Sequence, residues 1–101
     1  MIFDFKEMVE AIRQSNTYYN SFIDAQNMDI GILVLKPGEE DIQKPHTKDE
    51  IYFILQGDGY MVIDKENVPI KEKTFYLIKK NTFHKFFSNK KEIIAIYFLG
   101  C

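Results

Sequence analysis

Apolar residues near the start of the chain recur at helical spacing. The positions that would share one helix face are Phe5, Met8, Val9 and Ile12. Asp4 stands directly before this pattern and Glu7 follows it by three residues, which is close to a capping box. The pattern stops at Ser15 and Asn16, which are poor at continuing a helix. The sequence therefore predicts a short helix within residues 1–16.

The hydrophobic period changes from helical spacing to two after residue 28. Alternation from Met28 to Val34 ends at the Pro37-Gly38 turn, and further β-rich runs follow, separated by turn residues. The predicted strands cover residues 28–34, 50–55, 59–63, 74–78, 83–87 and 92–99. Short strands at such spacing are typical of a β-sandwich or a small barrel. We see no repeat or linker, so we expect one domain over residues 1–101.

Composition and charge restrict the class of partner. The chain has 101 residues, of which 46% are hydrophobic and 15% aromatic, enough for a core of its own. With 13 basic and 15 acidic residues, the net charge of −2 argues against nucleic acid as a partner.

Targeting signals and cysteine content indicate the compartment. The longest apolar run, Ile93 to Cys101, is far shorter than the ~20 residues of a membrane helix. The N-terminus carries acidic residues and has no secretory apolar core. Cys101 is the only cysteine, so no intrachain disulfide can form. We expect a cytoplasmic protein without membrane association.

The two histidines of the chain, His46 and His84, are the first candidates for chemistry. Glu50 follows His46 by four residues, and a fully extended chain would separate the two by roughly 13 Å. Metal–ligand bonds are only about 2 Å long, so an extended segment could not bring both to one ion. A turn at residues 47–49 would bring them together across two neighbouring strands.

The residues around His46 resemble the first conserved motif of the cupin superfamily. That motif has a glycine, a His-X-His triplet, a glutamate and a second glycine at set intervals. Gly38, His46, Glu50 and Gly57 stand at these intervals, and Lys44 occupies the slot of the first histidine. Residues 41–52 also resemble the string D-x-Q-x-P-H-x-x-D-E-x-Y of a subgroup of small single-domain cupins.

The second cupin motif is degraded. Lys73, Lys79 and Asn81 replace its glycine, proline and glycine, while His84 keeps its slot and Asn89 falls one residue late. The resemblance spans residues 28–99. It implies an all-β fold, a small cupin or jelly-roll β-barrel, preceded by the helical lead-in of residues 1–16.

The resemblance implies a metal site formed by His46, Glu50 and His84. Two imidazoles and a carboxylate with open positions are typical of non-haem Fe(II), and the same set can take Mn, Ni, Cu or Zn. Protonated Lys44 cannot be a ligand and should face solvent or an anionic substrate. Gln43 could supply an amide oxygen as the fourth ligand. The alternative is that His46 and Glu50 are surface turn residues, His84 caps a strand, and Gln43 is a hydrogen-bonded loop residue.

Strand parity identifies candidates for the lining of a ligand cavity. Tyr52 would share the face of Glu50, and Phe86 that of His84. We interpret Tyr52 as an acid/base or orienting hydroxyl and, with Phe86 and Lys44, as a substrate contact. The alternative for Phe86 is ordinary core packing.

Two functions are compatible with these residues. The first is a metal-binding cupin that acts on a small anionic metabolite as a dioxygenase, isomerase or lyase. The second is a cupin that binds or senses a small molecule, such as a sugar, without an active metal. With either function we expect a homodimer formed through a sheet face, which the N-terminal helix could cover. The sequence leaves open whether the protein is an enzyme.

Overall fold

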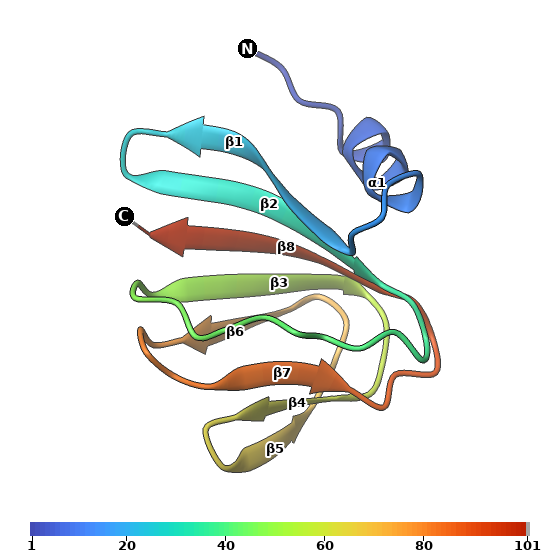
Figure 1. Ribbon diagram of the computed structural model, residues 1–101, viewed down its shortest axis with the longest axis vertical. Helices are drawn as coiled ribbons and strands as arrows, with labels where there is room; N and C mark the ends of the chain where they lie inside the picture. The colour runs from blue at the N-terminus through green and yellow to red at the C-terminus, as the bar shows by residue number, and fades with distance from the viewer. Residues whose placement is uncertain (101) are drawn as a thin grey trace.

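The computed structural model describes residues 1–100 and consists of one helix and two antiparallel sheets (Figure 1). The elements are α1 (Phe5–Arg13), β1 (Tyr19–Ala25), β2 (Met28–Leu35), β3 (Glu50–Gln56), β4 (Tyr60–Ile63), β5 (Glu66–Pro69), β6 (Thr74–Ile78), β7 (His84–Phe87) and β8 (Ile93–Gly100). The larger sheet has the order β1-β2-β8-β3-β6 and the smaller one β5-β4-β7. This architecture confirms the predicted all-β barrel with a short N-terminal helix.

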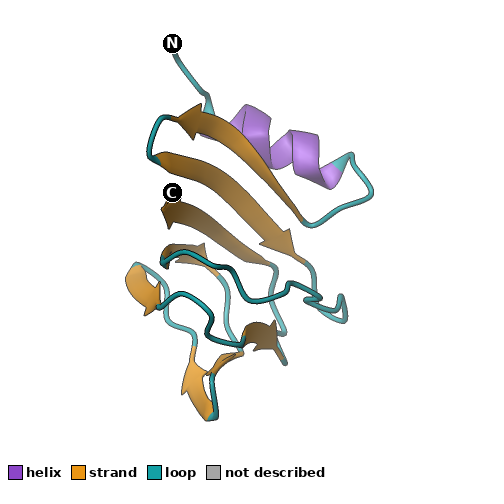
Figure 2. Ribbon diagram, turned by 60° about the vertical axis from the view of Figure 1, so that its left-hand side comes forward, coloured by secondary structure: helices purple, strands orange, loops and turns teal. Residues whose placement is uncertain are grey.

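Helix α1 begins where the sequence predicts it. The side chain of Asp4 accepts a hydrogen bond of 3.0 Å from the backbone N–H of Glu7, so Asp4 is the N-cap. The helix buries Val9 and Ile12 in a cluster with apolar residues of β2 and β8. Because nine residues are too few for a stable isolated helix, this packing on the outer face of the larger sheet stabilises α1 (Figure 2).

All six predicted strands are present, and the structure adds two that were not predicted, β1 and β5. The segment before Glu50 also differs from the expectation. Residues 36–49 form an irregular connection between β2 and β3, so the prediction that His46 lies on a strand paired with that of Glu50 is wrong. Two local features favour a loop there. Pro45 has no N–H for a strand ladder, and the side chain of Asp41 accepts the backbone N–H of Gln43 at 3.2 Å.

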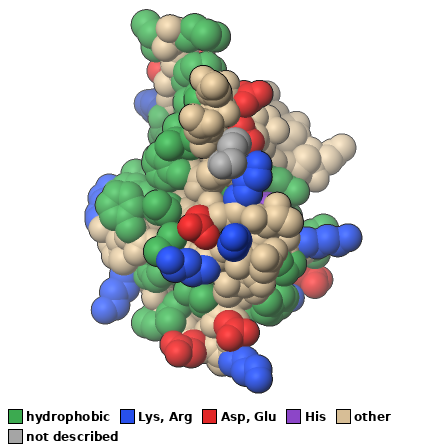
Figure 3. Space-filling view, turned by 90° about the vertical axis from the view of Figure 1, so that its left-hand side faces the viewer, with side chains coloured by type: hydrophobic (Ala, Val, Ile, Leu, Met, Phe, Trp, Pro, Cys, Tyr) green, Lys and Arg blue, Asp and Glu red, His purple; other side chains and the backbone are tan. Residues whose placement is uncertain are grey.

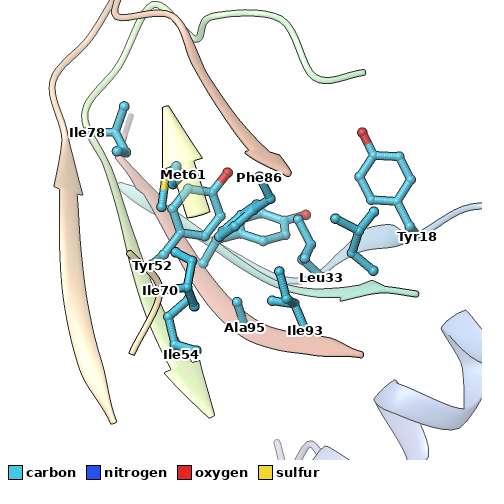
Figure 4. Packing of buried hydrophobic residues seen from close by; sticks show 12 residues of the cluster. Tyr18, Leu33, Tyr52, Ile54, Met61, Ile70, Ile78, Phe86, Ile93 and Ala95 are labelled. Atoms are coloured by element: carbon cyan, nitrogen blue, oxygen red, sulfur yellow. The ribbon is translucent and has the colours of Figure 1, made fainter. Parts of the chain in front are cut away.

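The main core lies between the two sheets (Figure 4). Along β3, Glu50, Tyr52 and Ile54 point inward and are almost inaccessible, which confirms the face that strand parity predicts. On β7, His84 and Phe86 likewise share the buried face. The first residues of β3 and β7, Glu50 and His84, therefore bring a carboxylate and an imidazole into the same interior.

No helix in residues 1–100 is long and apolar enough to cross a membrane.

Candidate metal centre

Three side chains from separate segments converge at one end of the barrel. His46 comes from the loop before β3, Glu50 opens β3, and His84 opens β7. One ligand atom from each lies within 4.8 Å of the other two. His84 Nε2 is 3.1 Å from Glu50 Oε1, and His46 Nε2 is 3.7 Å from the same oxygen. The side chains of Glu50 and His84 are each 2% exposed, whereas that of His46 is 33% exposed.

The donor atoms of this cluster have no hydrogen-bond partner within residues 1–100, although all three atoms are buried. The contact between His84 Nε2 and Glu50 Oε1 is short, but it does not have hydrogen-bond geometry. An unpaired buried polar atom costs about 1–3 kcal/mol, so three together at one point are unusual in a core. A divalent transition metal would satisfy all three, because imidazole nitrogen and carboxylate oxygen are its common ligands.

The orientation of the His84 ring suits a metal ligand. Its Nδ1 lies 3.0 Å from the carbonyl oxygen of Thr82, which can only accept a hydrogen bond. In the neutral ring the proton therefore sits on Nδ1 and the lone pair on Nε2, the atom that faces the cluster. The backbone at Thr82 thus selects the tautomer that can bind a metal.

Without a metal, this histidine would hold a proton more readily than usual. Burial lowers the pKa of His84, but the Glu50 carboxylate 3.1 Å away and the hydrogen bond to Thr82 outweigh burial, and the pKa rises above its ordinary value of 6.5. A proton and a metal would therefore compete for Nε2.

The loop that carries His46 is fastened to the ends of later strands. The backbone carbonyl of His46 accepts the N–H of Asn81 at 2.7 Å. Asp49 is held twice, since its side chain accepts the N–H of Lys80 at 2.9 Å and its carbonyl accepts that of Gly100 at 3.0 Å. These bonds, rather than strand pairing, bring His46 to within reach of Glu50.

Gln43 lies beside the cluster in a defined orientation. Its amide oxygen accepts a 3.3 Å hydrogen bond from the hydroxyl of Tyr52, and its amide nitrogen donates to Asp41 at 3.1 Å. Tyr52 is completely buried, and this burial, followed by the charges of Glu50 and Asp41, raises the pKa of its phenol well above 10. Tyr52 therefore stays protonated at neutral pH and acts as a donor.

Asp41 is a part of the site that the sequence reasoning missed. It is 2% exposed and accepts hydrogen bonds from the hydroxyl of Tyr18 at 2.9 Å and the N–H of Phe86 at 2.9 Å, in addition to the two from Gln43. The aspartate at the start of the string D-x-Q-x-P-H was the available signal. Its spacing to Gln43 was visible, but its contact with Phe86, 45 residues further along the chain, was not.

The predicted substrate contacts fall into two environments. Lys44 is exposed and lines an open hollow of about 340 Å³ together with Gln43 and His46. Phe86 is 1% exposed and packs edge-on against Tyr52, with ring centres 5.1 Å apart. The structure thus places Lys44 in an open hollow beside His46, and Tyr52 and Phe86 in the core behind the cluster of His46, Glu50 and His84.

Comparison with known proteins gives one family. The family model described as Cupin domain matches residues 31–99. An uncharacterized protein from Streptomyces coelicolor is 32% identical over 79 residues, which cover 77% of this chain and 75% of that protein.

Solved structures share the fold. A cupin-2 domain containing protein from Shewanella frigidimarina aligns with a TM-score of 0.76 at 15% identity, over 99% of this chain and 95% of that one. The DMSP lyase DddQ from Ruegeria pomeroyi aligns with a TM-score of 0.70 at 14% identity, over 76% of this chain and 40% of that one. At these identities the likeness concerns the fold alone.

Proposed function

Because this chain belongs to the cupin domain family, we propose that it binds a divalent transition metal through His46, Glu50 and His84 and acts on a small anionic metabolite. One observation carries the proposal: the three buried donor atoms of these side chains face one another without any hydrogen-bond partner in residues 1–100. Such a cluster is costly unless a cation neutralises it.

The donor set is compatible with several metals. Two imidazole nitrogens and one carboxylate oxygen suit Fe, Mn, Ni, Cu or Zn, and the amide oxygen of Gln43 is the proposed fourth donor. When bound, such an ion would supply Lewis-acid polarisation or, if it is redox-active, electrons. His46 is partly exposed and lines the hollow, whereas the three donor atoms lie buried behind it.

We place the substrate in the hollow beside His46. Of the residues that line it, Lys44 carries the only full charge, and the others are Tyr19, Ile42, Gln43, Pro45 and His46. An ammonium without a neighbouring carboxylate in the lining favours a carboxylate or phosphate group on the substrate. A hollow of about 340 Å³ is of the size that takes small molecules. Tyr52 is protonated and donates a hydrogen bond to the amide oxygen of Gln43, so it helps to hold that oxygen in position from the core side of the site.

A second function, binding without catalysis, is favoured by the state of Tyr52. This phenol is the acid/base candidate in the interior, yet its raised pKa keeps it protonated at neutral pH, so it cannot act there as a base. Under this alternative the hollow holds a metabolite, and the metal, where present, only orients it.

Metal content of the purified protein tests the first function. We expect near-stoichiometric Fe, Mn, Ni, Cu or Zn by plasma mass spectrometry in protein prepared without chelator, and loss of that metal in His46→Ala. Lys48→Ala, an exposed change in the same loop, is the matched control and should retain the metal. Metal-free protein that also fails to take up any of these ions on reconstitution would contradict the proposal. Turnover by the metal-loaded protein, against binding alone, then separates the two functions.

We also propose that the protein is a homodimer that buries the uncovered part of its larger sheet. Helix α1 contacts β1 and β2, whereas the outer face of β3 and β6 carries the exposed residues Ile51, Phe75 and Leu77. The first three residues, Met1 to Phe3, are also exposed, and hydrophobic side chains project at the N-terminal end in Figure 3. An exposed apolar face of this kind favours a second copy of the same chain as its cover.

Light scattering coupled to size exclusion tests the dimer. We expect twice the 12.0 kDa of the chain, and a shift to the monomer mass in Leu77→Lys. Lys80→Ala, an exposed change two residues after the end of β6, is the control. A 12.0 kDa particle for the unmodified protein at high concentration would exclude the dimer.

A further inference from the structure

The amide of Gln43 can bind a metal through only one of its two ends. The oxygen carries lone pairs, while the NH2 group has only protons to offer. A free glutamine side chain can present either end by rotating about its last bond. If Gln43 is the fourth donor of the proposed centre, some contact must therefore fix which end faces inward.

Asp41 supplies such a contact. Its carboxylate can only accept hydrogen bonds, and it lies 3.1 Å from Nε2 of Gln43, so it holds the NH2 end of the amide. The oxygen end then lies on the other side, where it accepts the hydrogen bond from the hydroxyl of Tyr52 at 3.3 Å. Both contacts agree on the same orientation, because the phenol of Tyr52 is a donor there and the carboxylate an acceptor. A carbonyl oxygen has two lone pairs, so one remains after Tyr52 has used the other.

Asp41 is itself immobilised. It is 2% exposed, and its second oxygen accepts the N–H of Phe86 at 2.9 Å, two residues after His84 on β7. The hydroxyl of Tyr18 donates to the first oxygen of Asp41 at 2.9 Å, and the same hydroxyl accepts the N–H of Ile42 at 2.8 Å. A carboxylate held by four donors cannot turn away, and the orientation that it imposes on Gln43 is correspondingly rigid.

We propose that Asp41 is a positioning residue, which fixes the amide of Gln43 with its oxygen toward the metal centre and makes that oxygen a stronger donor. The inference rests on the proposed metal binding and adds to it a reason for the fourth ligand. Its physical basis is the same as that of a carboxylate bound to the far nitrogen of a metal-ligating histidine, which orients the ligand and raises its basicity. The arrangement favours metals that accept oxygen, such as Mn²⁺ and Fe²⁺, over soft ions.

Titration with Mn²⁺ alone tests the role of Asp41. We expect Asp41→Asn to weaken Mn²⁺ binding by about 10–100-fold, the usual effect of losing an outer-shell partner. Gln43→Ala should cause a similar loss. Adding Asp41→Asn to the Gln43→Ala variant should then cost less than twofold more, because the residue through which Asp41 acts is gone.

An exchange of the two side-chain types provides a rescue. In the double variant Asp41→Asn, Gln43→Glu, both ends of residue 43 are oxygens and the amide of residue 41 can donate to it. Mn²⁺ affinity should return to within about fivefold of the wild type or exceed it, whereas Asp41→Asn alone stays weak. Asp58→Asn is the matched control, since Asp58 also accepts two backbone N–H bonds, from Lys90 and Lys91, but lies beyond the end of β3 opposite to Glu50.

A measurement on the metal-free protein tests the contact between Asp41 and Gln43 directly, without relying on Mn²⁺ affinity. In the metal-free wild type, the side-chain amide protons of Gln43 should exchange slowly with solvent in NMR spectra, and in Asp41→Asn they should exchange quickly. Thermal melting of each variant shows whether it is folded.

The outcomes separate this inference from the proposed function. If the wild type binds Mn²⁺ and His46→Ala does not, but Asp41→Asn binds as the wild type does, the inference is wrong and the metal site stands. The inference is also overturned if Asp41→Asn causes its full loss in the Gln43→Ala background, because Asp41 then acts by its charge or by ordering the loop. If the wild type binds none of the candidate metals, both fall together.

Discussion

The ring of Tyr97 lies directly against the backbone of Gly31, its register partner across the ladder between β2 and β8. A methyl group at Gly31 would overlap the Cζ and hydroxyl of Tyr97. Tyr97 in turn stands edge-on to Tyr52, with ring centres 6.5 Å apart, and its burial raises the pKa of its phenol to about 12. The absence of a side chain at Gly31 thus makes room for the aromatic packing behind the candidate metal centre.

Gly31→Ala should therefore destabilise the protein. Forcing the ring of Tyr97 aside should lower the free energy of unfolding by about 1–3 kcal/mol, the usual cost of overpacking a core. Gly100→Ala is the control, since its new methyl group would meet only the carbonyl oxygen of Asp49 at an ordinary 3.5 Å. Urea denaturation measures both, and equal stabilities of the two variants would contradict this reading of the Gly31 contact.

Metal binding should raise the melting temperature. Because the ion would bind the folded state alone, a free concentration of 100 times its Kd should add about 2.7 kcal/mol. For a domain of this size that corresponds to roughly 10–20 °C. Chelator should reverse the shift, and Glu50→Gln should abolish it. Glu40→Gln, which removes an exposed carboxylate of the neighbouring loop, should keep it, and an unchanged shift in Glu50→Gln would exclude Glu50 as a ligand.

The metal-free protein should gain stability from His84 at low pH. The folded pKa of His84 is raised, so its protonated pair with Glu50 contributes fully below about pH 6.5 and is lost as the pH rises through the folded value. In chelator, the stability difference between the wild type and His84→Asn should shrink as the pH rises above about 6.5 and through the raised folded pKa. Metal affinity should show the opposite trend and fall as the pH is lowered, because the proton occupies Nε2. A stability difference that does not vary with pH would show that this pair is not formed.

Lys44 should control ligand binding and leave the metal in place. Lys44→Ala should keep the metal content of the wild type, since a protonated ammonium is no ligand. It should weaken the binding of small carboxylates or phosphates about 10-fold or more, the value of a charge-assisted hydrogen bond of about 1.5–3 kcal/mol. Melting-temperature shifts with acetate and inorganic phosphate measure this, with Lys48→Ala as the control. Loss of the metal in Lys44→Ala would instead place Lys44 among the residues that build the centre.

The two strands that escaped prediction are both edge strands. β1 (Tyr19–Ala25) has no buried residue and its register with β2 shifts between Ser21 and Ile23, so neither face shows an alternating pattern. β5 (Glu66–Pro69) has four residues, ends in proline, and is partly buried only at Val68. These strands are defined by backbone hydrogen bonds to the adjacent strand and not by burial of one face. Backbone hydrogen bonds leave no hydrophobic alternation in the sequence.

The site was predictable where local spacing determined it. The family resemblance singled out His46, Glu50 and His84, and alternation along β3 placed Tyr52 on the face of Glu50. The path of the chain between Asp41 and Glu50 was not predictable, because it depends on hydrogen bonds to Phe86, Asn81 and Gly100. Such long-range contacts carry no periodic signal, which is also why Asp41 escaped notice.

The anchoring of the His46 loop has a consequence for the order of assembly. The carbonyl of Asp49 accepts the N–H of Gly100, and β8 is the strand that joins β2 to β3 in the larger sheet. During synthesis His46, Glu50 and His84 are all added to the chain before residue 100. The three donor side chains are therefore present before β8, the strand that aligns them, is complete. The candidate centre would be complete only after β8 has paired in the sheet. Metal binding would then stabilise the folded barrel and would not assist the earlier steps of its folding.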